Sequence, residues 1–115
     1  MALQGCVGCR EGAPQLVIEL FFGRAGVSDA AWDSFLASVV TPRFPDGLTV
    51  FEARGQWHDP RDQRVSREPA NVVQIAVPRD RYEPAKLAQV IEAYKTTFQQ
   101  QSVGRLIAER CGGFY

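Results

Sequence analysis

The sequence predicts an α+β domain whose strands and helices follow the order β-α-β-β-α-β. Four short stretches rich in Val, Ile, Leu, Phe and Thr, bounded by Pro, Gly or charged residues, have the character of strands. Two longer stretches place apolar residues three and four positions apart, which is the spacing of a helix that buries one face. A chain of 115 residues with 45% hydrophobic residues can form one soluble domain with its own core.

The first two elements are a strand and a helix. The strand is predicted over Gln15–Arg24, and since both of its sides are largely apolar we expect it to lie centrally in a sheet. Ser28 is a good N-cap for the helix that follows. The apolar stripe of this helix is Trp32, Phe35, Leu36 and Val39. Pro42 is expected to end the helix, because proline has no N–H to continue the hydrogen-bond ladder.

A turn, a second strand and a third strand make up the middle of the chain. Asp46-Gly47 supplies the turn chemistry, and the second strand is predicted over Leu48–Trp57. The charged stretch His58–Arg67 is expected to be a hairpin loop, and its second half could already be extended from Val65. The third strand is predicted over Ala70–Val77.

A second helix and a last strand complete the order. Pro84 suits the first turn of the helix, and Gly104 is expected to stop it. The apolar stripe of the second helix is Leu87, Val90, Ile91, Tyr94 and Phe98. The last strand is predicted over Arg105–Cys111.

This order, with two helices of similar length, predicts a ferredoxin-like βαββαβ sandwich. The four-stranded antiparallel sheet would have strands one and three at its centre and both helices on one face. The other face would be left for solvent, a partner or a ligand. Residues 1–14 are expected to form a flexible tail, and residues 15–115 a single α+β domain.

One long motif carries a family resemblance. The stretch TPRFPDGLTV at 41–50, followed by Gln56-Trp57, resembles the core of a bacterial family of small domains of unknown function. Three further matches are the first-strand pattern of Glu19 with Phe21–Arg24, the segment Arg67–Pro69, and Tyr94-Lys95 with Phe98 and Gln100–Val103. Gln101 and Gly104 depart from the pattern, where an acidic and an apolar residue are expected. Because the family has no established activity, the resemblance designates no catalytic residue.

Charge and cysteine usage exclude several classes of function. Lys plus Arg equals Asp plus Glu at 13 each, so the basic excess typical of nucleic-acid binding is missing. No apolar run approaches the roughly 20 residues of a membrane span. Cys6 and Cys9 form a C-x-x-C without the second pair that zinc needs and without the strand-to-helix setting of a redox motif. We therefore expect no metal site and no cofactor.

The third cysteine bears on the compartment. The chain as it stands is expected to be cytoplasmic, with free thiols. The cell envelope is the alternative, because the family resemblance implies envelope proteins and an upstream signal could be missing. In an oxidising compartment Cys111 could pair with Cys9 or Cys6, because the last strand would end near the start of the first.

The candidate site lies on the open face of the sheet. If the even-numbered residues of the first strand lie under the helices, Glu19 points to the open face. Val17, Phe21, Phe51, Val72, Gln74 and Thr49 would share that face with it. One interpretation is a packing or dimer face in which Gln74 or an Arg holds Glu19. The other is a ligand pocket with Glu19 as base or anchor, since a buried carboxylate tends toward a raised pKa.

Two further residues are candidate ligand contacts. Arg43 could bind an anionic ligand or pair with Asp46, and Glu68 is a conceivable partner of Glu19. Trp32 and Trp57 are expected to be packing residues, and His58 an exposed loop residue.

Two functional classes follow. The first is a non-catalytic ligand-binding or interaction domain, a homodimer that uses the open face. The second is a small cofactor-independent enzyme that resembles dimeric α+β-barrel isomerases, lyases or monooxygenases, with Glu19 as general base or acid.

Overall fold

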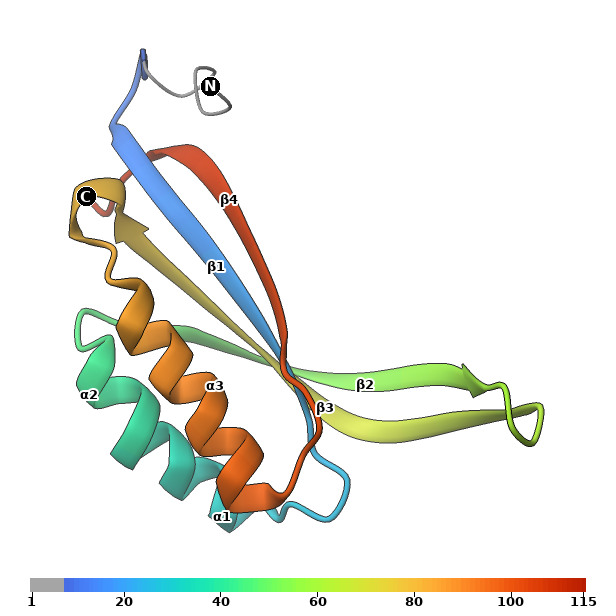
Figure 1. Ribbon diagram of the computed structural model, residues 1–115. Helices are drawn as coiled ribbons and strands as arrows, with labels where there is room; N and C mark the ends of the chain where they lie inside the picture. The colour runs from blue at the N-terminus through green and yellow to red at the C-terminus, as the bar shows by residue number, and fades with distance from the viewer. Residues whose placement is uncertain (1–7) are drawn as a thin grey trace.

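The computed structural model describes residues 8–115 and confirms the predicted sheet with helices on one face (Figure 1). The strands are β1 (Ala13–Gly23), β2 (Thr49–Asp59), β3 (Arg64–Pro78) and β4 (Gly104–Gly112). The helical segments are α1 (Asp29–Phe35), η2 (Leu36–Val40), α2 (Thr41–Arg43), η3 (Arg79–Arg81) and α3 (Pro84–Phe98). All four strands are antiparallel, in the order β2-β3-β1-β4, so β1 and β3 are central as predicted.

The core lies between the helices and the even-numbered side of β1. Ile18, Leu20 and Phe22 are fully buried there. The Phe22 ring packs 5.1 Å from the ring of Trp32 on α1 and 4.7 Å from that of Tyr94 on α3, measured between centroids. Burial of such large side chains is the main favourable contribution to folding, at about 1.5–3 kcal/mol each. Both predicted helix stripes therefore meet on β1.

The first helix does not end at Pro42 as the sequence predicts. Its N-terminus is as expected, because the Ser28 hydroxyl accepts a hydrogen bond from the Ala31 N–H. Residues 36–40 then form a wide π-helical turn in which the Thr41 N–H donates to the Leu36 carbonyl. Pro42 lies in the following short helix α2, close to its start. The wide turn shifts the hydrogen-bond ladder just before the proline, so the chain stays helical to Arg43.

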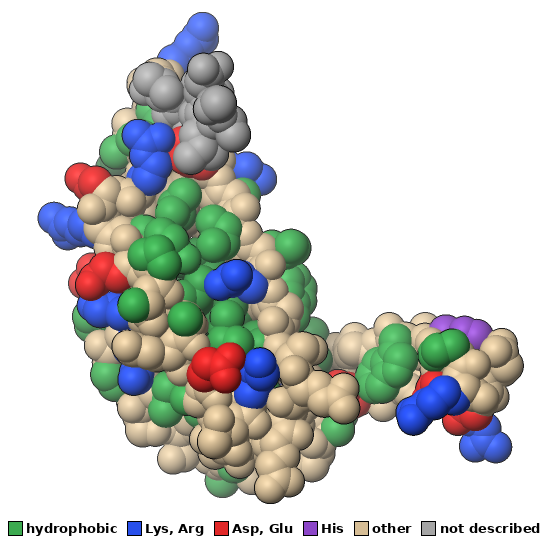
Figure 2. Space-filling view, viewed as in Figure 1, with side chains coloured by type: hydrophobic (Ala, Val, Ile, Leu, Met, Phe, Trp, Pro, Cys, Tyr) green, Lys and Arg blue, Asp and Glu red, His purple; other side chains and the backbone are tan. Residues whose placement is uncertain are grey.

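The β2–β3 hairpin is longer than predicted. Most of the predicted loop is strand, because His58 pairs with Val65 and Asp59 with Arg64, leaving a turn at residues 60–63. Since β1 pairs with β3 only as far as Ala70, residues 54–59 and 64–69 form a two-stranded projection, which we call the arm. Figure 2 shows the arm standing clear of the body. Trp57 lies on it with 48% of its surface exposed, so the expectation that Trp57 packs in the core is wrong.

The junction between α3 and β4 explains one departure from the family pattern. Helix α3 ends at Gln99, which is left-handed with φ of 55°, and not at Gly104. Gly104 instead begins β4 and pairs with Phe21. A Cβ at position 104 would lie 3.1 Å from the Phe21 Cβ and 3.3 Å from Cδ2 of its ring. The glycine thus leaves space for the Phe21 ring, and the side chain of a larger apolar residue would occupy that space.

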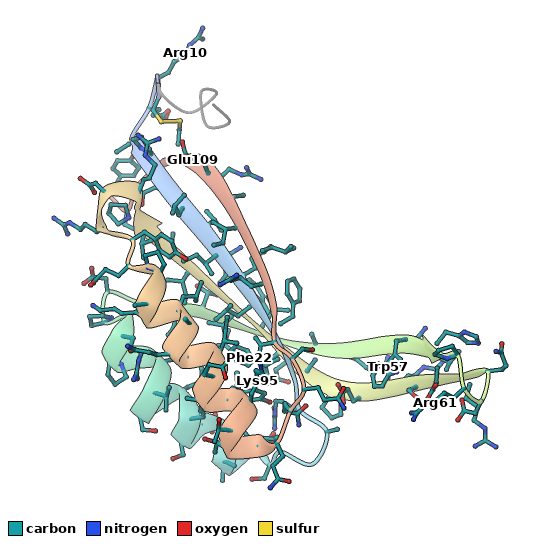
Figure 3. All side chains as sticks on the ribbon, viewed as in Figure 1. Arg10, Phe22, Trp57, Arg61, Lys95 and Glu109 are labelled. Carbon is teal, nitrogen blue, oxygen red and sulfur yellow. A yellow bond between two sulfur atoms is a disulfide. The ribbon has the colours of Figure 1, made fainter. Side chains whose placement is uncertain are left out.

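A disulfide joins the segment before β1 to the last residues of β4, at one end of the sheet. Cys9 is bonded to Cys111, which is one of the two pairings expected for an oxidising compartment and differs from the free thiols expected in the cytoplasm; Figure 3 draws this bond in yellow. The register explains it, because Pro14 of β1 lies opposite Cys111 of β4. Residues 1–7, part of the predicted tail and including Cys6, lie outside the described residues. No helix within residues 8–115 is long and apolar enough to cross a membrane.

Candidate functional site

The open face of the sheet carries two neighbouring rows of side chains. The strand register places Thr49, Gln74, Glu19 and Leu106 in one row across all four strands. The next row consists of Phe51, Val72, Phe21 and Gly104. These rows bring together four of the six predicted site residues: Glu19, Gln74, Phe21 and Phe51.

Glu19 is held by a neutral partner at the middle of this face. The Gln74 side-chain amide donates a hydrogen bond of 3.2 Å to the Glu19 Oε2 atom. Glu19 is half-buried, and its carboxylate accepts no other hydrogen bond from the described residues. Gln74 therefore orients the carboxylate without neutralising its charge, as the sequence suggested, and the second oxygen remains able to accept a donor.

The aromatic row leaves much apolar surface in water. Phe51 is 47% exposed and Phe21 is 41% exposed, on either side of the half-buried Val72. Leu106 of β4 adds a side chain that is 59% exposed on the same face. Trp57 lies four residues beyond Ala53 on β2, so it has the same parity and extends this face onto the arm. Contiguous exposed apolar surface of this kind marks binding surfaces in many proteins.

A cavity opens on the same face next to Gln74. It has a volume of about 520 Å³. Its polar lining includes Gln15, Thr49, Gln74 and the acidic residue Asp46, and its apolar lining includes Pro78 and Phe114. Gln15 is buried, and its side-chain amide donates to the Gly112 carbonyl at 3.3 Å. Amides, a hydroxyl and a carboxylate are suited to hydrogen-bond a polar ligand that is not an anion.

Arg43 and Glu68 are not brought to this site. Arg43 lies on the helix side, where its Nε donates to Gln89 at 3.0 Å and its Nη1 to the Val39 carbonyl at 2.9 Å. The expected pairing of Arg43 with Asp46 is not formed.

Glu68 pairs with Gly55 in the arm, six residues along β3 from Gln74. At strand spacing that is about 20 Å from the Gln74–Glu19 pair. A Cβ at Gly23 would overlap the Glu68 carboxylate, so this side chain covers the end of β1 instead. The suggested Glu19–Glu68 pairing is therefore wrong.

A polar cluster at the start of the arm escapes the sequence analysis. The Arg24 side chain, only 10% exposed, donates from Nη1 to Asn71 Oδ1 at 2.9 Å and from Nη2 to Asp29 at 2.6 Å. Asn71 is buried at 2% exposure and donates in turn to the Phe51 carbonyl at 3.1 Å. These bonds join β1, β2, β3 and the N-terminus of α1 beside the aromatic row. The Gly23-Arg24 pair noted in the family resemblance was the available signal.

Tyr94 fixes the same end of the sheet from the helix side. It is fully buried, and its hydroxyl donates a 2.5 Å hydrogen bond to the Gly23 carbonyl. Burial raises the pKa of Tyr94 to about 12, while the Arg24 charge lowers it and the Glu68 charge raises it further. Tyr94 is therefore a neutral donor under ordinary conditions.

Metal-binding side chains do not cluster in the described part of the chain. Within residues 8–115 no group of three His, Cys, Asp or Glu side chains could hold a metal ion.

The fold and the open face define the class of protein. This is a ferredoxin-like α+β domain with one sheet face covered by helices and the other open. Residues 18–114 match the model of the family described as "Protein of unknown function (DUF3574)", and the chain belongs to that family.

Solved structures share this fold at low sequence identity. A phage SAM lyase in complex with S-methyl-5′-thioadenosine has a TM-score of 0.64 and 16% identity, covering 88% of this chain and 85% of the lyase. The GlnK–ATP complex of B. subtilis has a TM-score of 0.55 and 13% identity, covering 86% and 84%. The phage SAM lyase in its apo state has a TM-score of 0.54 and 11% identity, covering 90% and 94%. No curated protein matches the sequence. At these identities the likeness shows the fold alone.

Proposed function

We propose that this protein is a small-molecule-binding domain that forms a homodimer through the open face of its sheet. The observation that carries the proposal is the exposed row of Phe51, Val72 and Phe21 beside the Gln74–Glu19 hydrogen bond. Burying this row against the same row of a second copy would remove two aromatic side chains per chain from water. Each fully buried apolar side chain of this size contributes about 1.5–3 kcal/mol.

The ligand site of this proposal is the cavity beside Gln74. Its volume of about 520 Å³ falls within the roughly 300–1,000 Å³ typical of small-molecule pockets. Its amide and hydroxyl groups, together with Asp46, favour a polar ligand that is not an anion. The two similar folds whose structures contain S-methyl-5′-thioadenosine and ATP are compatible with a small ligand, but these two ligands belong to those proteins.

The experiment compares the mass of the wild type with that of matched variants by light scattering. Phe21→Ser with Phe51→Ser should give monomers, because both changes replace apolar surface on the open face. Ile107→Ser is the control: Ile107 is 43% exposed but pairs with Ile18, so it has the parity of the helix-covered side. A wild type that stays monomeric at micromolar concentration and above would refute the dimer, and so would loss of the dimer in the control alone.

Catalysis by Glu19 is the second candidate function. The observation that favours it is the carboxylate oxygen left without a protein partner in the described residues. Glu19 does not line the cavity beside Gln74, which favours binding over chemistry. Glu19→Gln decides between the two: it should abolish turnover if the carboxylate moves a proton, and leave ligand binding and thermal melting nearly unchanged if it only orients Gln74.

We further propose that the protein works in an oxidising compartment. The Cys9–Cys111 disulfide supports this location, because such bonds persist in the envelope and are reduced in the cytosol.

A further inference from the structure

We propose that a second cavity, on the helix side of the sheet, binds a small organic carboxylate with an apolar body. The cavity has a volume of about 210 Å³. It lies between the end of α2 with the loop that follows, the last residues of β3, and the segment from η3 into α3. It adjoins the cavity beside Gln74 and shares part of its lining with it, namely Asp46, Gly47 and the β3 residues 76–78. Arg43, Arg81, Glu83 and Lys86 line only the cavity on the helix side.

The charge of the cavity selects an anion. Three cations line it, Arg43, Arg81 and Lys86, against the carboxylates of Asp46 and Glu83. Glu83 is already paired with Lys86 at 2.8 Å. Asp46, an exposed residue, is then the one remaining carboxylate of the lining to balance the guanidinium groups of Arg43 and Arg81. The lining therefore keeps an excess positive charge.

The two arginines have complementary roles. Arg43 is held in place by its bonds to Gln89 and the Val39 carbonyl, while its Nη2 group makes no hydrogen bond within the described residues. Arg81 is exposed and makes no hydrogen bond or ion pair within residues 8–115. The fixed Arg43 guanidinium, with its free Nη2 donors, and the unpaired Arg81 guanidinium can together bind a carboxylate through charge-assisted hydrogen bonds.

Backbone donors add to these side chains. Pairing between β2 and β3 begins at Thr49 and Gln74, whereas β1 pairs with β3 as far as Pro78. The side of β3 that faces away from β1 therefore has no strand partner over residues 75–78. Alternate residues of an antiparallel strand direct their N–H and C=O groups to the same side. The N–H groups on the unpaired side of β3 therefore belong either to Ala76 or to Ile75 and Val77.

The N-terminus of α3 also favours an anion in this cavity. Glu83, its N-cap residue, and Lys86 of its first turn both line the cavity, and no side chain caps this end. The partial positive charge of a 15-residue helix is thus directed at a cavity that already contains two guanidinium groups.

The apolar wall of the cavity would contact the apolar body of the ligand. Phe44 and Ile75 are buried core residues at 7% and 1% exposure, and Tyr82, Pro45 and Pro78 complete the apolar lining. An inorganic anion would leave this wall in contact with water, whereas an aromatic or short branched carboxylate would cover it. The volume, below the usual range for drug-sized ligands, limits the body to a compact group.

The test is a titration of the isotope-labelled full chain at pH 7, followed by amide chemical shifts. The probes are benzoate, its neutral isostere benzamide, and inorganic phosphate. Benzoate should shift the amides of Tyr82, Glu83 and Lys86, which line this cavity and not the one beside Gln74. It should bind about tenfold or more tightly than benzamide. Arg81→Gln should weaken benzoate binding by about three- to tenfold, because it removes a charged donor from a side chain with no structural bonds.

The same amide spectra provide the control and the results that would contradict the proposal. Arg54→Gln, an exposed arginine in the arm, should leave benzoate binding unchanged, and each variant must keep the wild-type amide spectrum. Equal binding of benzoate and benzamide would overturn the proposal. So would shifts confined to Thr49 and Gln74, an unaffected Arg81→Gln variant, or phosphate binding as tight as benzoate, which would indicate a simple anion site. Absence of shifts at millimolar benzoate would also overturn it, without bearing on the open-face dimer.

Discussion

At the scale of single residues, the buried Asn71 matters more to stability than the shorter, exposed ion pair beside it. Arg24 contacts Asp29 at 2.6 Å, but the Asp29 side chain is 93% exposed and water screens the pair. Asn71, at 2% exposure, satisfies both Arg24 and the Phe51 carbonyl. Distance alone is therefore a poor guide to which contact stabilises the fold.

A pair of variants checks this ranking. Asn71→Leu should lower the free energy of unfolding by about 2–4 kcal/mol, because it removes the buried hydrogen bonds of Asn71 to Arg24 Nη1 and to the Phe51 carbonyl. Asp29→Asn, which keeps the shape of the exposed partner, should cost less than about 1 kcal/mol. Urea unfolding of both variants measures the difference. A cost for Asp29→Asn equal to or above that of Asn71→Leu would contradict this account.

Tyr94 makes the stability depend on pH in the alkaline range. Its pKa is raised to about 12 by burial, above the ordinary value of 10.0. Between these values the folded state holds a proton that the unfolded state has lost, so raising the pH favours unfolding. The contribution is fully present below pH 10, is lost as the pH rises through about 12, and amounts to about 2–3 kcal/mol.

Tyr94→Phe is the matched control for this pH dependence. In urea unfolding from pH 8 to 11.5, the stability of the wild type should fall more steeply than that of Tyr94→Phe above pH 10. Parallel curves over this range would show that Tyr94 does not titrate with a raised pKa.

Residue contacts were predictable from sequence where they depend on strand parity alone. Glu19 and Gln74 occupy equivalent positions on two central strands, so alternation placed them on one face. The Arg24–Asn71 bond joins residues 47 apart, and it depends on a register that no local pattern encodes. The position of Arg43 on the helix side could not be predicted, because it depends on how α2 follows the π-helical turn.

At the scale of elements, the arm was missed because its residues look like a loop. Charged residues and a proline between two apolar stretches usually mark a turn. Here they form strands whose side chains bond to each other across the hairpin, as Arg67 does with Gln56 at 2.8 Å. Because the arm covers no core, its sequence does not alternate between apolar and polar residues. Figure 3 shows Trp57 and Arg61 far from Phe22 and the helices.

Hydrogen exchange should distinguish the arm from the body. A two-stranded hairpin alone is marginal in water, so amides of residues 54–59 and 64–69 should exchange faster than those of Ile18, Leu20 and Val73. If the arm also contacts a second copy, its protection should rise with protein concentration. Protection of the arm equal to that of the core at every concentration would contradict the description of the arm as an independent projection.

At the scale of the whole molecule, the shape is extended for its size. The radius of gyration is 16.1 Å. A compact domain of this length would have about 13 Å. The arm projects from the body, and the uncovered sheet face carries the apolar surface that the proposed dimer would bury.

The disulfide ties Cys9 to Cys111, which are 102 positions apart in the sequence. In the chain-entropy model a loop of this length contributes about 4–5 kcal/mol, and measured values are usually lower. Alkylation of the unreduced protein should therefore spare Cys9 and Cys111, and Cys111→Ser should lower the free energy of unfolding by about 2–4 kcal/mol. Labelling of Cys9 and Cys111 in protein isolated under oxidising conditions would count against the bond.

The most direct measurement of the proposed dimer is an isotope-filtered NOE experiment on a mixture of ¹³C-labelled and unlabelled chains. The account predicts contacts between chains from the methyl groups of Val72 and Leu106 to the rings of Phe21 and Phe51. Contacts that come only from the helix face, for example from Ile91, would contradict it, as would the absence of any contact between chains.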